Sequence, residues 1–345
     1  MNEQKPVPVD PVRVAQVGVG YWGPNLLRNL VSSPRYSVRM AVEKDSDRKK
    51  LINKLYPELP VSSDFSAVCD DPDIEAIIIA TPVASHADLA IKALKKGKHV
   101  LVEKPMATTV DEVTQIEHLS REGQLVAMVG HTFLFNNAVR QIKRIIDSGE
   151  IGQIRYIYAR RLNLGRIRCD VDALWNLAPH DISIIQYWLD DPEPLRVQRT
   201  GMDYVQKGID DVVFLNISYQ DGIMANVHVS WLDPHKVRQI TVVGEKKMIV
   251  YDDMEPSEKI KIYDKGISLT EPEEIHQLLV KYRSGNMLAP NILPTEALKL
   301  EVSEFIDQVK SNSAYSDNDL THGRYVVEIL EASNQSLKRN QRVYL

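Results

Sequence analysis

Three glycines near the start of the chain have the spacing of a dinucleotide-binding turn. Gly18, Gly20 and Gly23 form the pattern G-x-G-x-x-G. Tyr21 and Trp22 lie between the last two. The pattern alone is weak because glycines occur in many turns, but here it follows an apolar, strand-like segment and leads into a segment of helical periodicity. In that context glycines permit a tight turn, a close approach of pyrophosphate and close packing of helix on strand. We therefore predict that this turn binds dinucleotide phosphates at the N-terminus of a helix.

An acidic residue follows at the distance expected for such a turn. Glu43 stands twenty residues after Gly23, at the end of the second predicted strand. A carboxylate there accepts hydrogen bonds from the adenosine ribose hydroxyls, and its charge disfavours a 2′-phosphate. These features predict NAD rather than NADP, although the nearby Lys44 and Arg48 favour a phosphate. Taken separately, the glycines could be a structural turn and Glu43 a solvated carboxylate, but their joint spacing favours the nucleotide.

Further polar side chains follow later strands of the same half. The candidates are Thr81, Pro82, His86, Glu103 and Lys104, which come after the third and fourth buried segments. Ligands of open α/β sheets bind at the carboxyl ends of the strands, so we expect these residues in the cofactor crevice. A lone lysine is ordinarily a surface charge, and this alternative stays open for Lys104.

His180 is the candidate for proton transfer. It lies in the segment 175–182, which includes Trp175 and Asn176 and precedes an apolar stretch with the character of a helix. An imidazole can accept a proton near neutral pH. From spacing alone, a histidine that caps a helix or lies in the core is the more common alternative.

The elements of the first half alternate between strand and helix. Strands are predicted at 12–17, 37–42, 76–80, 99–103 and 125–130, with helices at 24–32, from 46, at 85–96 and at 110–122. Such a series builds a parallel sheet with helices on both faces. We therefore predict a doubly wound dinucleotide-binding domain over 11–135, preceded by a short flexible tail over 1–10.

The second half has a different rhythm. Strands are predicted at 153–164, 212–219, 223–231, 238–243 and 247–251, and helices at 138–148, 294–311 and 322–338. Short turns such as Asp221-Gly222 are compatible with hairpins, so this sheet is expected to be largely antiparallel. Residues 136–345 are therefore predicted to form a second α/β domain that carries the substrate chemistry.

Composition narrows the class of protein. The 345 residues suggest about two domains, and the 43% of hydrophobic and 26% of charged residues are ordinary for a globular chain. A net charge of -5 without a basic arm argues against nucleic acid as a partner. The two cysteines lack metal-site or disulfide spacing, and neither a signal peptide nor a membrane span is recognisable. We expect no metal, no membrane partner and a cytoplasmic location.

Together these motifs resemble the Gfo/Idh/MocA oxidoreductases. The resemblance covers nearly the whole chain and rests on the glycine pattern, Ala80-Thr81-Pro82 with His86, the segment 97–105 with its Glu-Lys-Pro ending, the segment 148–152, and His180-Asp181. It implies an N-terminal Rossmann domain and a C-terminal α/β domain whose open sheet is often used for oligomerisation. It also implies a late helix that returns to the first domain.

The resemblance assigns roles to two residues. By it, Lys104 is the active-site lysine and His180 is the proton acceptor for the substrate hydroxyl. Asn176 departs from the family pattern, because many members carry an aspartate four residues before the histidine. An amide supplies no charge, so we expect a less basic His180, a different division of labour, or reduced catalysis.

The substrate is suggested by a basic segment and by two longer signatures. Four arginines lie between positions 160 and 168, and guanidinium groups suit phosphate. A solvated rim or a subunit contact is an equal alternative. The segments 20–25 and 174–181 are similar to those of members that oxidise the 3-hydroxyl of UDP-N-acetylglucosamine-type sugars. The candidate substrate contacts are Arg161, Asn163, Arg166, Trp175, Asn176 and His180.

We therefore expect an NAD-dependent dehydrogenase of a nucleotide sugar that serves amino-sugar or surface-polysaccharide biosynthesis as a homo-oligomer, either a dimer or a tetramer. Two alternatives remain. One is a dehydrogenase of a free polyol or monosaccharide, and the other is a non-catalytic NAD-binding regulator.

Overall fold

The chain forms two compact units in a computed structural model that describes residues 10–270, 279–311, 317–339 and 341–345. Unit 1 comprises Met1–Gly130 and Leu298–Arg324, and unit 2 comprises His131–Ala297 and Tyr325–Leu345. Apart from Asp10, the tail predicted at 1–10 lies outside the described residues.

Unit 1 is built on a six-stranded sheet in the order β3-β2-β1-β4-β5-β6. All five neighbouring pairs are parallel, which is the arrangement predicted from the alternating pattern. The order is that of a doubly wound dinucleotide-binding sheet. The strands are β1 (Val12–Val17), β2 (Tyr36–Val42), β3 (Val61–Ser62), β4 (Ala76–Ile79), β5 (His99–Glu103) and β6 (Ala127–Gly130).

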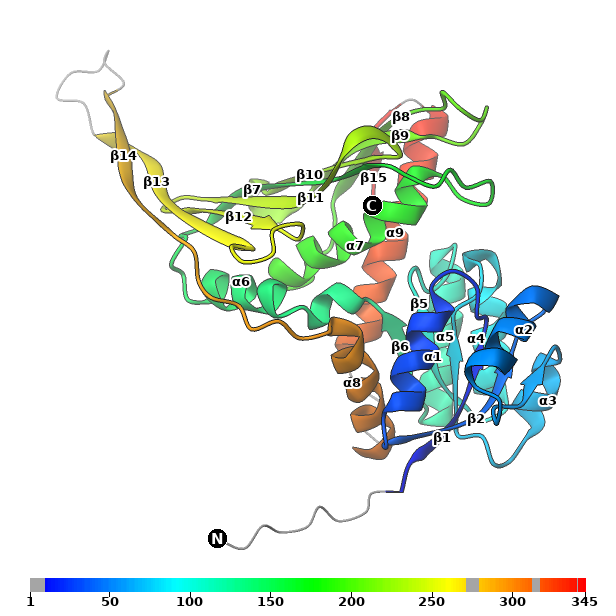
Figure 1. Ribbon diagram of the computed structural model, residues 1–345. Coiled ribbons are helices and arrows are strands. Elements are labelled where there is room, and N and C mark those ends of the chain that lie inside the picture. The colour runs from blue at the N-terminus through cyan, green and yellow to red at the C-terminus, as the bar shows by residue number, and fades with distance from the viewer. Residues whose placement is uncertain (1–9, 271–278, 312–316, 340) are drawn as a thin grey trace, which may run out of the picture. The chain divides into compact units, whose positions relative to one another are not determined.

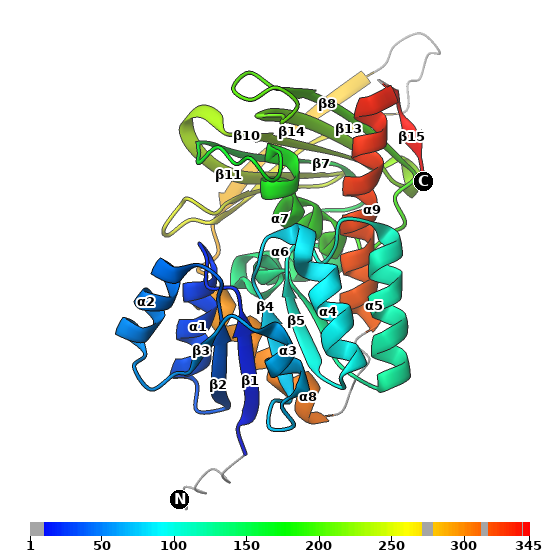
Figure 2. The same ribbon diagram turned by 90° about the vertical axis from the view of Figure 1, so that its right-hand side faces the viewer.

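Helices cover both faces of this sheet (Figures 1 and 2). Local sequence explains several of their starts: Pro24 occupies the first turn of α1, Asp45 caps α2, and Thr109 and Glu112 form a reciprocal capping box on α5. The helices are α1 (Gly23–Ser32), α2 (Ser46–Leu55), α3 (Phe65–Asp70), α4 (His86–Lys95), α5 (Val110–Gly123) and α8 (Ala297–Ser311).

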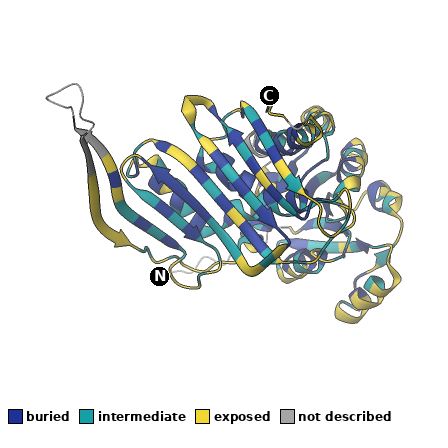
Figure 3. Cartoon of the chain, turned by 90° about the horizontal axis from the view of Figure 1, so that it is seen from above, coloured by how far each residue is buried: buried dark blue, intermediate teal, exposed yellow. Residues whose placement is uncertain are grey.

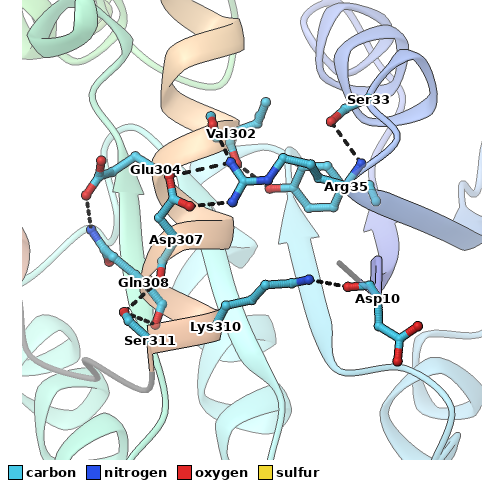
Figure 4. Close-up of polar contacts among 11 residues, drawn as sticks. Asp10, Ser33, Arg35, Val302, Glu304, Asp307, Gln308, Lys310 and Ser311 are labelled. Carbon is cyan, nitrogen blue, oxygen red and sulfur yellow. Dashed lines mark hydrogen bonds and ion pairs between the residues drawn. The ribbon is translucent and has the colours of Figure 1, made fainter. Parts of the chain in front are cut away.

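Helix α8, although late in the sequence, packs against the start of β2 (Figure 4). The Tyr36 hydroxyl donates to the Val302 carbonyl at 2.5 Å. Arg35 donates to the Ser303 hydroxyl at 2.7 Å and forms an ion pair with Asp307. These contacts join α8 to the strand that precedes Glu43.

Unit 2 contains a nine-stranded sheet in the order β14-β13-β12-β11-β7-β10-β9-β8-β15. All neighbouring pairs are antiparallel except β7 with β10, so the prediction of a largely antiparallel sheet is confirmed. The strands are β7 (Ile154–Leu164), β8 (Arg196–Met202), β9 (Val212–Ser218), β10 (Met224–Ser230), β11 (Leu232–Gly244), β12 (Met248–Asp252), β13 (Ile260–Thr270), β14 (Leu279–Leu288) and β15 (Val343–Tyr344).

One face of this second sheet is covered by helices and the other is open. Helices α6 (Asn137–Asp147), α7 (Ala173–Trp188) and the later turns of α9 (Asp317–Arg339) share a continuous apolar core with the buried residues of the strands. Figure 3 shows the sheet with many exposed or half-buried residues along its strands. Tyr156, Phe214 and Met224 are exposed apolar side chains of the open face.

Within the part of the chain that the structure describes, no helix is both long enough and apolar enough to cross a membrane.

Candidate functional site

The glycine turn after β1 is shaped by the absence of side chains. Gly18 has a φ of +87°, and a Cβ there would lie 2.6 Å from the Ala80 carbonyl oxygen. A Cβ at Gly23 would lie 2.5 Å from the Gly18 carbonyl oxygen. At Gly20, by contrast, no atom lies within 4 Å of where a Cβ would be. Two glycines therefore allow tight packing, and the third leaves open space above the turn.

Gln16 holds this turn in place, and sequence reasoning missed it. Its side chain is completely buried within β1. The Nε2 group donates to the carbonyl oxygens of Gly23 at 2.8 Å and Gly18 at 3.1 Å. A polar residue in an otherwise apolar strand, two residues before the first glycine, was the signal that could have revealed it.

The N-terminus of α1 points out of the turn without a capping side chain. Trp22 is the N-cap residue, and its side chain accepts no hydrogen bond from the first turn of α1. The first amides of a helix and its dipole favour an anion. Tyr21 and Trp22 are exposed beside this end. Pro24 has no N–H, and the Asn25 amide already donates to the Trp22 carbonyl at 2.9 Å, so the dipole of α1 and the amides of the preceding turn are what can attract a phosphate.

Glu43 directly follows β2 and is joined to the glycine turn. Its carboxylate accepts from the Val19 amide at 2.7 Å, the Lys44 amide at 2.7 Å and the Asp45 amide at 3.0 Å. A carboxylate has about four acceptor positions, so these three bonds fix the group and leave it capacity for a hydroxyl donor. Three features fit a dinucleotide whose adenosine ribose carries no 2′-phosphate: the open space at Gly20, the uncapped end of α1 and the fixed carboxylate of Glu43.

His86 connects the ends of two neighbouring strands. Its Nδ1 lies 2.8 Å from the Pro105 carbonyl oxygen, and its Nε2 lies 2.7 Å from the Thr81 carbonyl oxygen. Burial lowers the pKa of His86, and the bonds to Pro105 and Thr81 oppose this. The Thr81 side chain in turn lies against Gly18. His86 and Thr81 therefore position the residues around the turn.

Glu103 and Lys104 stand at the end of β5, before Pro105, and the Lys104-Pro105 peptide bond is cis. The Glu103 Oε2 atom accepts from the Lys104 amide at 3.2 Å, and its Oε1 atom is completely enclosed. Burial raises the pKa of Glu103 to about 7, opposed by the charge and amide of Lys104 and by a bond from the Trp22 side chain. We call the edge that holds Gly18, Gly20, Gly23, Glu43 and Lys104 the carboxyl edge of unit 1.

His180 lies in unit 2, inside α7 rather than before it. The sequence prediction placed the segment 175–182 ahead of a helix, but α7 begins at Ala173 and continues through Pro179. Asp172 caps the helix by accepting from the Trp175 amide at 2.9 Å. This cap starts the helix early, and Pro179 costs it one backbone hydrogen bond without ending it.

Next to His180 lies a buried ion pair. Arg161 of β7 donates two hydrogen bonds to Asp181, at 2.7 and 2.9 Å. Its guanidinium lies over the Phe133 ring, 4.9 Å from the centroid, and that ring contacts the His180 ring at 5.0 Å between centroids. Arg161 was predicted as a substrate contact; its Nε and Nη2 atoms are bonded to Asp181, and its side chain is buried. The ion pair joins β7 to the part of α7 that carries His180.

Asn176 lies one turn before His180 and contacts a buried tryptophan. The Trp231 indole Nε1 donates to the Asn176 Oδ1 at 3.3 Å. Asn163 lies close by, because a Cβ at Gly165 would contact both the Asn163 amide and the Trp231 ring. We call Arg161, Asn176, His180, Asp181 and Trp231, the residues in and around this part of α7, the α7 cluster.

The remaining predicted substrate residues lie apart from this arrangement. Trp175 is buried and donates through its indole to Asn334 at 3.2 Å, so it anchors α7 to α9. Arg166 is exposed in the loop after β7. Among the described residues, no group of three or more histidine, cysteine, aspartate or glutamate side chains is arranged to hold a metal ion.

Comparison with known proteins gives this arrangement a family. Residues 12–131 match the family described as "Oxidoreductase family, NAD-binding Rossmann fold", and residues 139–250 match the GFO/IDH/MocA C-terminal domain. The structure is similar to that of GenD2 from gentamicin A biosynthesis in complex with NAD, with a TM-score of 0.81, 19% identity and coverage of 100% of this chain and 99% of that chain.

Two further relatives carry names that bear on the substrate. UDP-N-acetylglucosamine 3-dehydrogenase GnnA from Acidithiobacillus ferrooxidans has a TM-score of 0.78 at 19% identity, covering 96% of this chain and 99% of that chain. The scyllo-inositol 2-dehydrogenase (NAD(+)) of Bacillus subtilis (strain 168) is 34% identical over 148 residues, covering 42% of this chain and 43% of the relative.

The chain spans about 37% to 59% of the length of the first curated relatives it matches. Similarity over that share of their length does not assign their activities to this chain. The two family matches follow each other along the chain and include both the carboxyl edge of unit 1 and the α7 cluster. The predicted family, fold class and NAD cofactor agree with these matches. The chain belongs to the Gfo/Idh/MocA family of NAD-binding oxidoreductases.

Proposed function

We propose that the protein is an NAD-dependent dehydrogenase that oxidises a sugar hydroxyl to a ketone. The observation that carries this proposal is that one edge of one parallel sheet holds both the dinucleotide cradle and Lys104. Gly18 packs against Ala80 and Thr81, and His86 joins Thr81 to Pro105, the residue after Lys104. A cation beside a nucleotide cradle suits chemistry in which negative charge develops on a substrate oxygen.

The two halves of the chemistry fall to different residues. NAD, when bound, supplies the hydride acceptor. Neutral His180 takes the proton from the hydroxyl, and Lys104 stabilises the negative charge that develops on that oxygen. Phe133 and the Arg161–Asp181 pair support His180 by fixing the helix and ring around it. Glu43 binds the ribose, and the glycine turn binds the pyrophosphate.

The substrate that we propose is a UDP-N-acetylglucosamine-type sugar, oxidised at its 3-hydroxyl for amino-sugar or surface-polysaccharide biosynthesis. The name of GnnA, a relative in fold, supports this choice, and so does the exposed Arg166, whose guanidinium suits a diphosphate. The second candidate is a free polyol, favoured by the 34% identity with the scyllo-inositol enzyme. A non-catalytic NAD-binding regulator is the third.

We also propose that the protein is a homo-oligomer, a dimer or tetramer joined through the open face of the unit 2 sheet. Met224 pairs with Tyr156 across β10 and β7, and both side chains are exposed. Phe214 stacks on His228 at 4.1 Å on the same face. Light scattering should give two or four chains per particle, and Met224→Glu should reduce this number. A monomeric wild-type protein would exclude the proposal.

The function is tested by following NADH absorbance with UDP-N-acetylglucosamine, scyllo-inositol, myo-inositol and glucose as separate substrates. A coupled aminotransferase that removes the ketone pulls the reaction forward. We expect turnover with the nucleotide sugar, and a loss of about hundredfold or more in kcat for Lys104→Met and for His180→Asn. Lys95→Met, at the end of α4, is the matched control. Turnover of free sugars alone would overturn the nucleotide assignment, and NAD binding without turnover would favour the regulator.

A further inference from the structure

The loop between β8 and β9, residues 203–211, presents an aromatic ring to solvent. Tyr204 is 68% exposed. The Gln206 side chain donates to the Arg168 carbonyl at 2.9 Å, which joins this loop to the loop between β7 and α7. Arg166, two residues before Arg168, is exposed on that second loop. An exposed ring and an exposed guanidinium group therefore lie on two loops that contact each other.

Hydrogen bonds within the β8–β9 loop fix its backbone. The Val205 amide donates to the Asp211 carboxylate at 2.7 Å, and the Gly208 amide donates to the Asp203 carboxylate at 2.7 Å. Gly208 has a φ of +84°, which glycine adopts without strain. Because the backbone around Tyr204 is already ordered, a ligand that binds the ring loses little affinity to the ordering of the loop.

The same loop is attached to the start of α7, the helix that carries His180. The Ala173 amide donates to the Asp210 carbonyl at 2.9 Å, and the Arg199 guanidinium donates to both Asp172 and Asp210 at 2.6 Å. His180 follows the Asp172 cap by eight residues, which corresponds to about 12 Å along the helix axis. The β8–β9 loop therefore adjoins the far end of the helical segment that leads to His180.

The arrangement suits a long substrate with an aromatic end. Aromatic side chains stack on nucleobases of any type, and a guanidinium group matches a diphosphate. In a nucleotide sugar, the diphosphate and the ribose separate the sugar from the base, so the base binds well away from the reacting hydroxyl. A sugar ring at His180 would extend its diphosphate toward Arg166 and its base toward Tyr204. A free polyol has no group that reaches this ring.

We propose that Tyr204 is a specificity residue that stacks on the nucleobase of the substrate. The base subsite lies on the β8–β9 loop of unit 2, and Arg166 on the adjoining loop binds the diphosphate that leads to it. This inference rests on the proposed function and extends it, because it assigns the nucleotide end of the substrate to residues separate from the reacting groups. Tyr204 therefore affects substrate binding and leaves the chemical step unchanged.

The first test measures the binding of UDP alone by calorimetry, with saturating NAD present so that the glycine turn is occupied. Tyr204→Ser should weaken UDP binding about tenfold, because the stacking surface is lost. Tyr204→Phe keeps the ring and should bind UDP within about twofold of the wild type. The matched control is Tyr344→Ser, which removes an exposed ring that pairs with the other end of β8, at Arg196, and should leave UDP binding unchanged.

The second test compares UDP-N-acetylglucosamine with N-acetylglucosamine 1-phosphate, which has a phosphate but no base. Tyr204→Ser should raise KM about tenfold for the nucleotide sugar, with kcat unchanged, and should have no effect on the sugar phosphate. Arg166→Gln should raise KM for both substrates.

Three results would overturn the inference: no binding of UDP to the wild type, equal binding of UDP to the wild type and Tyr204→Ser, or equal losses of Tyr204→Ser with both substrates. A change in the number of chains per particle in Tyr204→Ser, measured by light scattering, would assign the ring to a subunit contact instead. A wild-type protein that binds UDP through Tyr204 but oxidises no sugar would refute the proposed function and leave the base subsite in place.

Discussion

The carboxyl edge of unit 1 and the α7 cluster of unit 2 are built in different ways. The first is formed mainly by backbone: three glycines, carbonyl oxygens bonded by Gln16 and His86, and a carboxylate held by three amides. The second is formed by side chains that hold one another, Arg161 with Asp181 and Trp231 with Asn176. A site formed by backbone groups keeps the same hydrogen-bonding groups when side chains change, which suits a cofactor that is always the same. A site formed by side chains gains or loses donors and acceptors with each substitution.

The largest effect is expected where a side-chain contact of the α7 cluster is broken. Asp181→Asn leaves Arg161 buried without its carboxylate, so the free energy of unfolding should fall by about 3–5 kcal/mol. Chemical denaturation of the whole protein, followed by tryptophan fluorescence, measures this change. The control is Asp170→Asn, which breaks the half-exposed pair with Arg168 and should cost less than about 1 kcal/mol. Equal losses of unfolding free energy in the two variants would show that the buried pair contributes no more to stability than the half-exposed one.

The carboxyl edge should instead separate folding from binding. Gly18→Ala places a side chain at a φ of +87° and against Ala80, so it should cost about 3 kcal/mol of stability as well as NAD binding. Gly20→Ala meets nothing within 4 Å, so the melting temperature should stay unchanged. Its methyl group fills the open space of the turn, and NAD affinity measured by calorimetry should fall at least about tenfold. If the Gly20→Ala variant binds NAD with normal affinity, the pyrophosphate does not bind at this turn.

Glu103, which precedes Lys104, is an exception beside the carboxyl edge, because the residue is half-buried and its Oε1 atom is completely enclosed. Burial raises its pKa from 4.5 to about 7, so the folded state binds this proton more tightly than the unfolded state. The stabilisation is complete below about pH 4.5 and is lost as the pH rises through about 7, which amounts to roughly 3 kcal/mol.

Glu103→Gln should therefore gain stability relative to the wild type as the pH rises from about 5 to about 8. Thermal unfolding across that range measures the difference. Glu58→Gln, a change at an exposed position, is the control and should run parallel to the wild type. A constant difference between Glu103→Gln and the wild type would mean that Glu103 keeps its ordinary pKa in the folded protein.

The same contrast explains what the sequence could predict. Gly18 and Gly23 are informative because a Cβ at either would clash with a backbone oxygen, and Gly20 is informative because it leaves the space above the turn open. The alternation of strand-like and helical segments predicted β1, β2, β4, β5 and β6. The role of Gln16 was not predicted, because its hydrogen bonds go to carbonyl groups of a turn whose geometry exists only in the folded protein. The place of His180 inside α7 escaped because Pro179 indicates a helix boundary locally, whereas Asp172 caps the helix earlier. The hydrogen bonds of Arg161 and Asn176 join segments that are far apart in the sequence. The periodicity of apolar residues predicts local helices and strands and does not predict such contacts.

The smallest effect concerns the choice of cofactor at the carboxyl edge. Glu43 combines a charge with a position fixed by the amides of Val19, Lys44 and Asp45, so repulsion of a 2′-phosphate should give NAD at least about tenfold tighter binding than NADP. Glu43→Gln removes the charge and keeps one acceptor oxygen, which can serve either the Val19 amide or the Lys44 and Asp45 amides. We expect its preference for NAD over NADP to fall by about tenfold, which corresponds to about 1.4 kcal/mol.

Calorimetric titration with both cofactors measures this preference directly. Asp47→Asn, an exposed change in the next helix, tests whether any nearby negative charge has the same effect, and it should alter the preference less than twofold. If the wild type prefers NADP by tenfold or more, Lys44 and Arg48 rather than Glu43 decide the cofactor. The backbone of the carboxyl edge would then accept either dinucleotide, and one side-chain charge would make the choice, as single side chains do in the α7 cluster.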